Sequence, residues 1–342
     1  MDEIISALRS SPLFYLFLSS RELFHTNFWF WLSTLNEFET LKLFGSDSNS
    51  NKALSFVREH KQSSRVDKKI KSEVDLLINC GNRPLIVVEN KVKDFPTSAQ
   101  LLRIRKSFDD QALSYVLTTL FSYPELVFEG WQMRTYGDIS SDIVPENFTK
   151  NEYYRALIRD YKDFTKSLSD LASLLPITDM YDFAIPFMPQ LFDTLNEIKL
   201  WEGYQKLRAS HLLNRFNAHR ADIETSYLLN NQKATLIFHC PIKDNYEVQV
   251  SLEGNQFRKV IGGRNINQMA VNLLSKQVLF TANFVQRDGS HFCRYDNKGD
   301  KQYRYQYESI APISFHKLFE KICNEIMIIE KQKFIIESCI PD

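Results

Sequence analysis

Apolar positions follow a helical period in some segments of the chain and form short continuous runs in others. Helical spacing predicts helices over residues 2–40, 53–60, 99–108 and 151–171, with a second helix starting at Ser19 inside the first range. Runs of β-branched and apolar residues predict strands at 76–78, 85–88, 114–120 and 133–136. This order of elements predicts an α/β domain whose mixed sheet is flanked by helices.

The pattern changes beyond a predicted boundary within Pro176–Asp179. Residues 181–229 have helical spacing, and residues 314–335 predict a closing helix. Between them, strands are predicted near 234–239, 246–252, 278–284, 291–295 and 303–307. Gly262-Gly263-Arg264 predicts a turn, and Asp296-Asn297-Lys298-Gly299 predicts the tip of a hairpin. We therefore expect two domains, residues 1–175 and 176–342, of which the second is an α+β accessory domain.

The segment Glu73–Lys91, with the sequence EVDLLINCGNRPLIVVENK, predicts a hairpin that carries charges at its open end. Folding back symmetrically about Asn82 places Asp75 opposite Glu89 and Glu73 opposite Lys91. Opposed residues in an antiparallel pair hold their Cβ atoms about 4.5–5.5 Å apart. This register gathers two carboxylates and one ammonium on one face of the sheet, an arrangement that suits a hard metal ion.

The apolar run Leu85–Val88 predicts a strand that is buried on both faces. Charges at the end of such a strand lose hydration, which costs several kcal/mol each unless they are paired or bind metal. The structural alternative is an ordinary cross-strand ion pair between Glu73 and Lys91, with Asp75 merely ending its strand.

Composition narrows the class of protein. With 44% hydrophobic and 13% aromatic residues among 342, the chain can bury a substantial core. The formal net charge of zero removes the simplest argument for nucleic-acid binding, although the segment Arg58–Lys71 holds six basic and two acidic residues. A solvated loop explains that segment equally well. The five cysteines are scattered, so we expect neither a zinc site nor a disulfide framework. The N-terminus predicts neither a signal peptide nor a membrane span, and the expected location is the cytoplasm.

These motifs together resemble the PD-(D/E)xK nuclease superfamily, with its restriction-endonuclease-like fold, and in particular an uncharacterised bacterial branch. The matching residues are Glu22…His25…Trp31-Leu32, Val74-Asp75-Leu76, Val88-Glu89-Asn90-Lys91, Gln100-Leu101, Tyr115–Leu120 and Trp131…Tyr136. The resemblance covers residues 15–170 and does not extend into the second half. Val74 stands where relatives often have proline, and Ile104 stands where many have tyrosine.

The resemblance implies a Mg²⁺- or Mn²⁺-dependent nuclease that hydrolyses DNA, with an endonuclease role in defence against foreign DNA. Asp75, Glu89 and the backbone carbonyl of Asn90 would coordinate the metal, and Glu22 would join it through water. Lys91 would orient the attacking water or stabilise the developing negative charge, and Gln100 would position the attacking water or Lys91.

Several of these residues have structural alternatives. Glu22 could close a capping box with Ser19, His25 could be a hydrogen-bonded core residue, and Gln100 could simply cap or pack its helix. At the level of function, the alternative is a catalytically inactive nuclease fold that binds nucleic acid or a protein partner. The expected partners are DNA and, through the C-terminal domain, a second copy of the chain or another protein. No membrane partner is expected.

Overall fold

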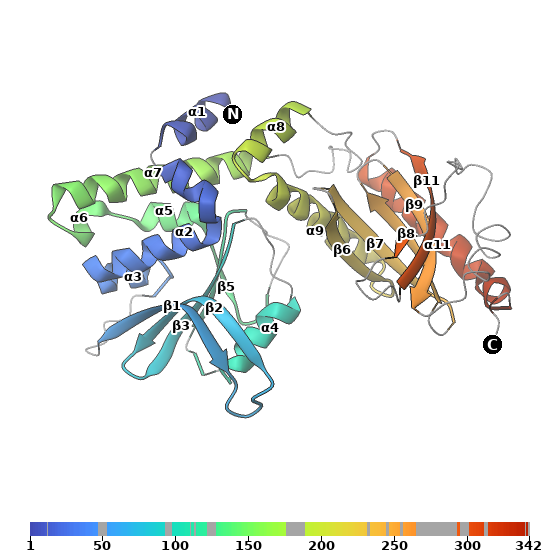
Figure 1. Ribbon diagram of the computed structural model, residues 1–342, viewed down its shortest axis with the longest axis horizontal. Helices are drawn as coiled ribbons and strands as arrows, with labels where there is room; N and C mark the ends of the chain where they lie inside the picture. The colour runs from blue at the N-terminus through green and yellow to red at the C-terminus, as the bar shows by residue number, and fades with distance from the viewer. Residues whose placement is uncertain are drawn as a thin grey trace. The chain divides into compact units, whose positions relative to one another are not determined.

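The computed structural model describes residues 1–11, 13–46, 53–92, 98–109, 111–112, 114–121, 128–175, 189–230, 233–243, 246–253, 256–264, 293–294, 301–310, 314–338 and 340. The chain divides into two compact units (Figure 1). One comprises Met1–Pro176 with Ile198–Gly203, and the other comprises Ile177–Glu197 with Tyr204–Asp342. The first division lies beside the predicted boundary, whereas Ile198–Gly203 belongs to the first unit although it lies far beyond that boundary.

The first unit combines helices with a five-stranded sheet, as expected for a mixed α/β domain. Its helices are α1 (Asp2–Ser10), α2 (Leu13–Leu35), α3 (Glu37–Lys42), α4 (Ser98–Ser107), α5 (Tyr136–Asp142), α6 (Pro145–Phe148) and α7 (Glu152–Leu174). Its strands are β1 (Leu54–Ser63), β2 (Lys71–Cys80), β3 (Arg83–Lys91), β4 (Ser114–Thr119) and β5 (Gln132–Thr135).

The sheet of the first unit has the strand order β1-β2-β3-β4-β5 and mixed direction. Neighbours among β1, β2 and β3 run antiparallel, whereas β3, β4 and β5 run parallel. The central strand β3 is buried along nearly its whole length, which confirms the prediction from its continuous apolar run. One face packs against α4, where Leu101 and Ile104 join Leu77 and Val87 in a buried apolar cluster.

Local sequence signals account for the long helix α7. Asn151 caps its start by accepting a hydrogen bond of 3.1 Å from the backbone N–H of Tyr154. Its buried positions then recur three or four residues apart, from Ile158 through Tyr161 to Leu171, which is the apolar stripe of an amphipathic helix. The periodicity that predicted a helix over residues 151–171 is therefore confirmed.

Three sequence predictions in the first unit are wrong. Residues 53–60 form the strand β1 and not a helix, because their polar residues alternate with Leu54 and Phe56 and their backbone pairs with β2. The basic segment Arg58–Lys71 is not a solvated loop, since it makes up the end of β1, a turn and the start of β2. Helix α2 runs without a break through Ser19, so no new helix starts there.

The second half of the chain contributes a six-stranded antiparallel sheet with the order β10-β11-β9-β8-β7-β6. Its strands are β6 (Glu224–Asn230), β7 (Lys233–Pro241), β8 (Tyr246–Glu253), β9 (Gln256–Arg264), β10 (Cys293–Arg294) and β11 (Lys301–Ser309). The helices here are α8 (Pro189–Glu197), α9 (Trp201–His219) and α11 (Phe315–Ser338). Apolar residues of α9 and α11, such as Phe216 and Ile326, pack with this sheet in one core.

The second half departs from the sequence predictions at two places. The predicted helical stretch 181–229 ends in the strand β6, whose backbone pairs with β7. Gly262-Gly263-Arg264 is not a turn, because it continues β9 between β8 and β11. The predicted strand 278–284 and the turn Asp296–Gly299 lie outside the described residues. Among the residues that the structure describes, no helix combines the length and apolar character needed to cross a membrane.

Candidate active site

The β2–β3 hairpin has the register that the sequence predicts. Leu76 pairs with Val88, and Ile78 pairs with Ile86, so the chain folds back symmetrically about Asn82. The register shifts only beside the turn, after Ile78. Continued by one residue, this register places Asp75 opposite Glu89 at the open end of the hairpin.

Alternation along β3 sends consecutive residues of the Glu89-Asn90-Lys91 motif to opposite faces of the sheet. Glu89 faces α4, where it accepts a hydrogen bond from Gln100, and Lys91 lies on the same side, beside Glu89. Asn90 faces α2, where its side chain donates to the backbone carbonyl of Glu22. The site is therefore built on one face and anchored from the other.

Residue Glu89 is only 3% exposed, and its carboxylate faces two donors, the ammonium of Lys91 and the amide of Gln100. Its Oε1 lies 2.8 Å from Lys91 Nζ and accepts a 2.9 Å bond from Gln100 Nε2. Burial raises the pKa of Glu89, while the positive charge of Lys91 acts in the opposite direction. Gln100 thus lies in the site, as the sequence predicted, with its amide directed at a carboxylate.

Asp75 is a second carboxyl beside Glu89, on a residue that is only partly buried. Its Oδ2 accepts a 2.7 Å hydrogen bond from the backbone N–H of Asn90. Burial raises the pKa of Asp75 to about 7, and the negative charge of Glu89 adds to that rise. Two neighbouring carboxyls that resist ionising together, one buried and one partly buried, form a place where a cation is stabilised.

Glu22 reaches the same end of the sheet from helix α2. Its Oε1 accepts a 3.3 Å hydrogen bond from the backbone N–H of Val92, one residue beyond β3. Its charge contributes to the raised pKa of both Asp75 and Glu89, so the three carboxyls lie close enough to interact. The alternative role for Glu22, a capping box with Ser19, is wrong, because Ser19 lies inside α2 and not at its start.

The side chain of Asn90 has a structural role that the sequence did not reveal. Its Oδ1 accepts hydrogen bonds of 2.9 Å from Thr118 and 2.6 Å from Tyr136. Its Nδ2 donates to the Glu22 carbonyl at 2.8 Å and to Thr26 at 3.3 Å. Asn90 therefore joins α2 to the sheet and fixes the backbone that carries Glu22. The signal available in the sequence was a polar Thr118 inside the apolar run of β4.

His25 belongs to the core and not to the site. The side chain is fully buried, and its Nδ1 is 2.9 Å from the hydroxyl of Tyr161. The rings of Phe24 and Tyr136 lie against it, with centroids 5.0 and 4.4 Å away. Burial lowers its pKa to about 3, so the imidazole is neutral at physiological pH.

The ion pairs at the hairpin differ from the structural alternative that pairs Glu73 with Lys91. Glu73 lies 3.8 Å from Lys61 on β1, and both side chains are exposed. Lys91 instead lies against the buried Glu89, with only 16% of its side chain exposed. The Lys91 ammonium therefore lies beside the buried carboxylate of Glu89.

The residues at this site could hold a hard cation, but with few ligands from the protein. Among the described residues, no three His, Cys, Asp or Glu side chains are grouped so as to hold a metal ion. The fit rests instead on the buried Glu89 and the partly buried Asp75, whose raised pKa values a bound cation would lower. Mg²⁺ takes one or two carboxylates and keeps several waters, which matches this donor set.

Comparison with known proteins adds no family to this picture. The chain matches no protein-family model, no curated protein and no solved structure.

Proposed function

We propose that this protein is a metal-dependent nuclease that hydrolyses phosphodiester bonds in DNA. One observation carries the proposal: Asp75, Glu89 and Lys91 meet at the end of a buried strand, with Gln100 and Glu22 reaching them from two helices. Burying these charges has a high energetic cost, and a purely structural role would gain little from it.

Asp75, Glu89 and the backbone carbonyl of Asn90 would hold Mg²⁺ or Mn²⁺, with Glu22 joining through water. When bound, the ion would make a coordinated water more acidic and would offset negative charge on the scissile phosphate. Lys91 provides a cation that can donate a hydrogen bond to a phosphate oxygen as its charge grows. Gln100 holds Glu89 in place at 2.9 Å, so that its carboxylate does not rotate away from the site.

An endonuclease role in defence against foreign DNA follows from the resemblance of the motifs alone. Cutting both strands of a duplex would be served by two copies of the chain, each with one site. We propose that the C-terminal unit, which has its own sheet and core, binds a second copy of the chain or another protein.

A second candidate function is a catalytically inactive module that binds nucleic acid or a protein. One observation favours it: Lys91 and Gln100 already neutralise and bond Glu89. In that case the cluster serves to hold the hairpin together.

The test is cleavage of supercoiled and linear DNA, single- and double-stranded, by the full chain with Mg²⁺ or Mn²⁺ and with a chelator. Metal-dependent cleavage should fall roughly 10²-fold or more in Glu89→Gln and in Lys91→Ala, since each removes charge stabilisation from the transition state. Glu73→Gln is the matched control, because Glu73 is exposed on β2 and paired with Lys61. Undiminished cleavage in both site variants would refute the proposal.

Calorimetric titration of Mn²⁺ separates the two candidate functions without relying on activity. We expect binding by the wild type and by Glu73→Gln, and its loss in Asp75→Asn and Glu89→Gln. If the wild type binds no metal and cleaves nothing while folding normally, the inactive module is the better account.

A further inference from the structure

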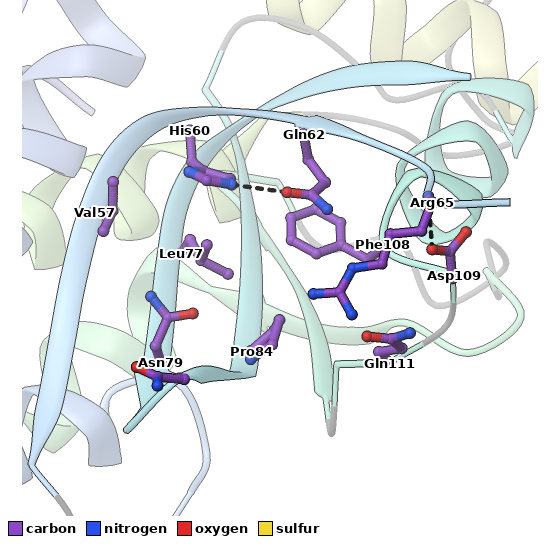
Figure 2. Close-up of a pocket in the computed structure, with 11 residues that line it drawn as sticks. Val57, His60, Gln62, Arg65, Leu77, Asn79, Pro84, Phe108, Asp109 and Gln111 are labelled. Atoms are coloured by element: carbon purple, nitrogen blue, oxygen red, sulfur yellow. Dashed lines mark hydrogen bonds between the residues drawn. The ribbon is translucent and has the colours of Figure 1, made fainter. Parts of the chain in front are cut away.

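A hollow of about 200 Å³ lies on the sheet of the first unit, between the edge strand β1 and the end of α4 (Figure 2). It is smaller than the ~300–1,000 Å³ typical of sites for drug-sized ligands, so it suits one small flat group, such as a single nucleobase, and not a large molecule. Leu77 and Phe108 contribute apolar surface to it. Strand β1 arches over the hollow beyond Glu59, whose backbone has a φ of 48°.

The remaining lining is unusually rich in neutral groups that both donate and accept hydrogen bonds. Carboxamides come from Gln62, Asn79, Asn82 and Gln111, and His60 adds an imidazole. The Nε2 atom of His60 lies 3.1 Å from Oε1 of Gln62, so a base would have to replace this bond or use the other groups (Figure 2). Figure 2 shows the side chain of Arg65 reaching into the hollow from its rim. A side chain that offers paired donors and acceptors suits the edge of a heteroaromatic base.

The rim of the hollow is rigid and basic. Asp109 accepts hydrogen bonds from the Ser64 hydroxyl and, at 2.9 Å, from the backbone N–H of Arg65, which fixes the β1–β2 turn onto the end of α4. The hairpin carries further exposed cations, namely Lys61, Lys68, Lys69 and Lys71, which we call the basic hairpin. Between residues 61 and 71 the only acid is Asp67. Phosphate groups are the natural counterions for such a surface.

We propose that the hollow binds one unpaired purine base of a single-stranded nucleic acid while the basic hairpin holds the neighbouring phosphates. A carboxamide matches adenine N6 and N7, and a guanidinium matches guanine O6 and N7, so both kinds of side chain here fit a purine edge. A phosphate inside the hollow is disfavoured because the Asp109 carboxylate lines it. A base within a duplex cannot enter, since its edge is paired and its faces are stacked.

The hollow also lies where it could act together with the candidate active site. Gln100, which bonds Glu89, is near the start of α4, and Phe108 directly follows its end. Eight helical residues span about 12 Å, a distance that a short single strand can bridge. The inference assumes the nucleic-acid substrate of the proposed function, but it concerns binding and not cleavage.

The test is fluorescence anisotropy with labelled oligo(dA), oligo(dC) and a mixed-sequence duplex of equal length, in chelator so that nothing is cut. The wild type should bind oligo(dA) most tightly. Gln62→Ala and Gln111→Ala, singly and together, should weaken the affinity for oligo(dA) by roughly fivefold or more. The affinity for oligo(dC) should stay nearly unchanged. Gln132→Ala, at an exposed position on β5, is the matched control.

The basic hairpin has a separate signature. Lys68→Ala combined with Lys69→Ala should weaken the affinity for both single strands equally. It should also reduce the slope of log affinity against log salt by about 1.4, at about 0.7 per phosphate contact. Equal affinity of the wild type for oligo(dA) and oligo(dC), or equal loss of both in the glutamine variants, would overturn the inference.

The outcomes for binding and for cleavage are distinguishable. A purine preference that depends on Gln111, without any cleavage by the wild type, supports the hollow and counts against the nuclease. Metal-dependent cleavage by a chain without purine preference supports the nuclease and refutes the hollow.

Discussion

The hydroxyl of Tyr136 donates a 2.6 Å hydrogen bond to Oδ1 of Asn90, in a region where both side chains are fully buried. Tyr136 begins α5, and Asn90 lies between the two charged residues of the candidate site on β3. The same amide also bonds Thr118 on β4 and the carbonyl of Glu22 on α2. One asparagine therefore connects four elements of the first unit and sets where the charged residues lie.

Replacing Asn90 by leucine should destabilise the protein. The change leaves the Tyr136 hydroxyl buried without its acceptor, at about 1–3 kcal/mol, and also removes the hydrogen bonds of the amide to Thr118 and to the Glu22 carbonyl. We expect a loss of about 3 kcal/mol in the free energy of unfolding by urea, whereas Asn82→Ala in the exposed turn should change it by less than about 0.5 kcal/mol. A loss no larger than that of the control would show that the network contributes little.

The unfolding free energy should reveal the raised pKa of Asp75. Its carboxyl has a pKa of about 7 in the folded chain and 3.8 as its reference value, so the folded state binds the proton more tightly. Its contribution to stability is full below about pH 4 and is lost as the pH rises through about 7. Asp75→Asn should therefore be more stable than the wild type at pH 8, by at most a few kcal/mol.

Urea titrations of the wild type and Asp75→Asn at a series of pH values measure this difference. The gap between the two proteins should widen from pH 4 to pH 8. Added Mg²⁺ should stabilise the wild type at pH 8 and not the variant, because a cation offsets the buried charge. A constant gap across this range would contradict the raised pKa.

His25 should make the protein sensitive to acid. Its pKa is lowered from 6.5 to about 3 by burial, so the folded state resists protonation. The stabilising contribution is present above pH 6.5 and is lost as the pH falls toward 3. In His25→Phe this part of the pH dependence should disappear from thermal or urea unfolding. The exposed His316→Gln should keep the wild-type profile.

The second unit contains a buried ion pair that can be tested by a double-mutant cycle. Lys259 on β9 is 1% exposed, and its ammonium pairs with the carboxylate of Glu325 on α11. Lys259→Met alone should cost about 3–5 kcal/mol, since it leaves a buried carboxylate without its partner. Lys259→Met with Glu325→Leu should recover most of that loss, as measured by urea unfolding. No recovery in the double variant would mean that packing, and not charge, dominates at this position.

Strong local patterns were enough to predict much of the first unit. The continuous apolar run of β3, the turn around Asn82 and the stripe of α7 each determine an element through short-range chemistry. The hairpin register followed from the same residues, and with it the positions of Asp75 and Glu89. Segments whose pattern fits more than one kind of element were predicted wrongly. Residues 53–60 form a strand because β2 offers its backbone a partner, which no local periodicity reveals.

By itself, the sequence determined which charges the hairpin brings to one end, because strand alternation and turn symmetry are properties of adjacent residues. Only the tertiary structure decided what surrounds them. In the folded chain Gln100 donates a hydrogen bond to Glu89, and Glu22 accepts one from the backbone of Val92. The side chain of Asn90 bonds α2 to the sheet. The tertiary structure also folded the basic segment over a hollow at the far end of α4. Contacts between elements far apart in the chain depend on how whole helices and strands pack, and no single segment encodes that packing.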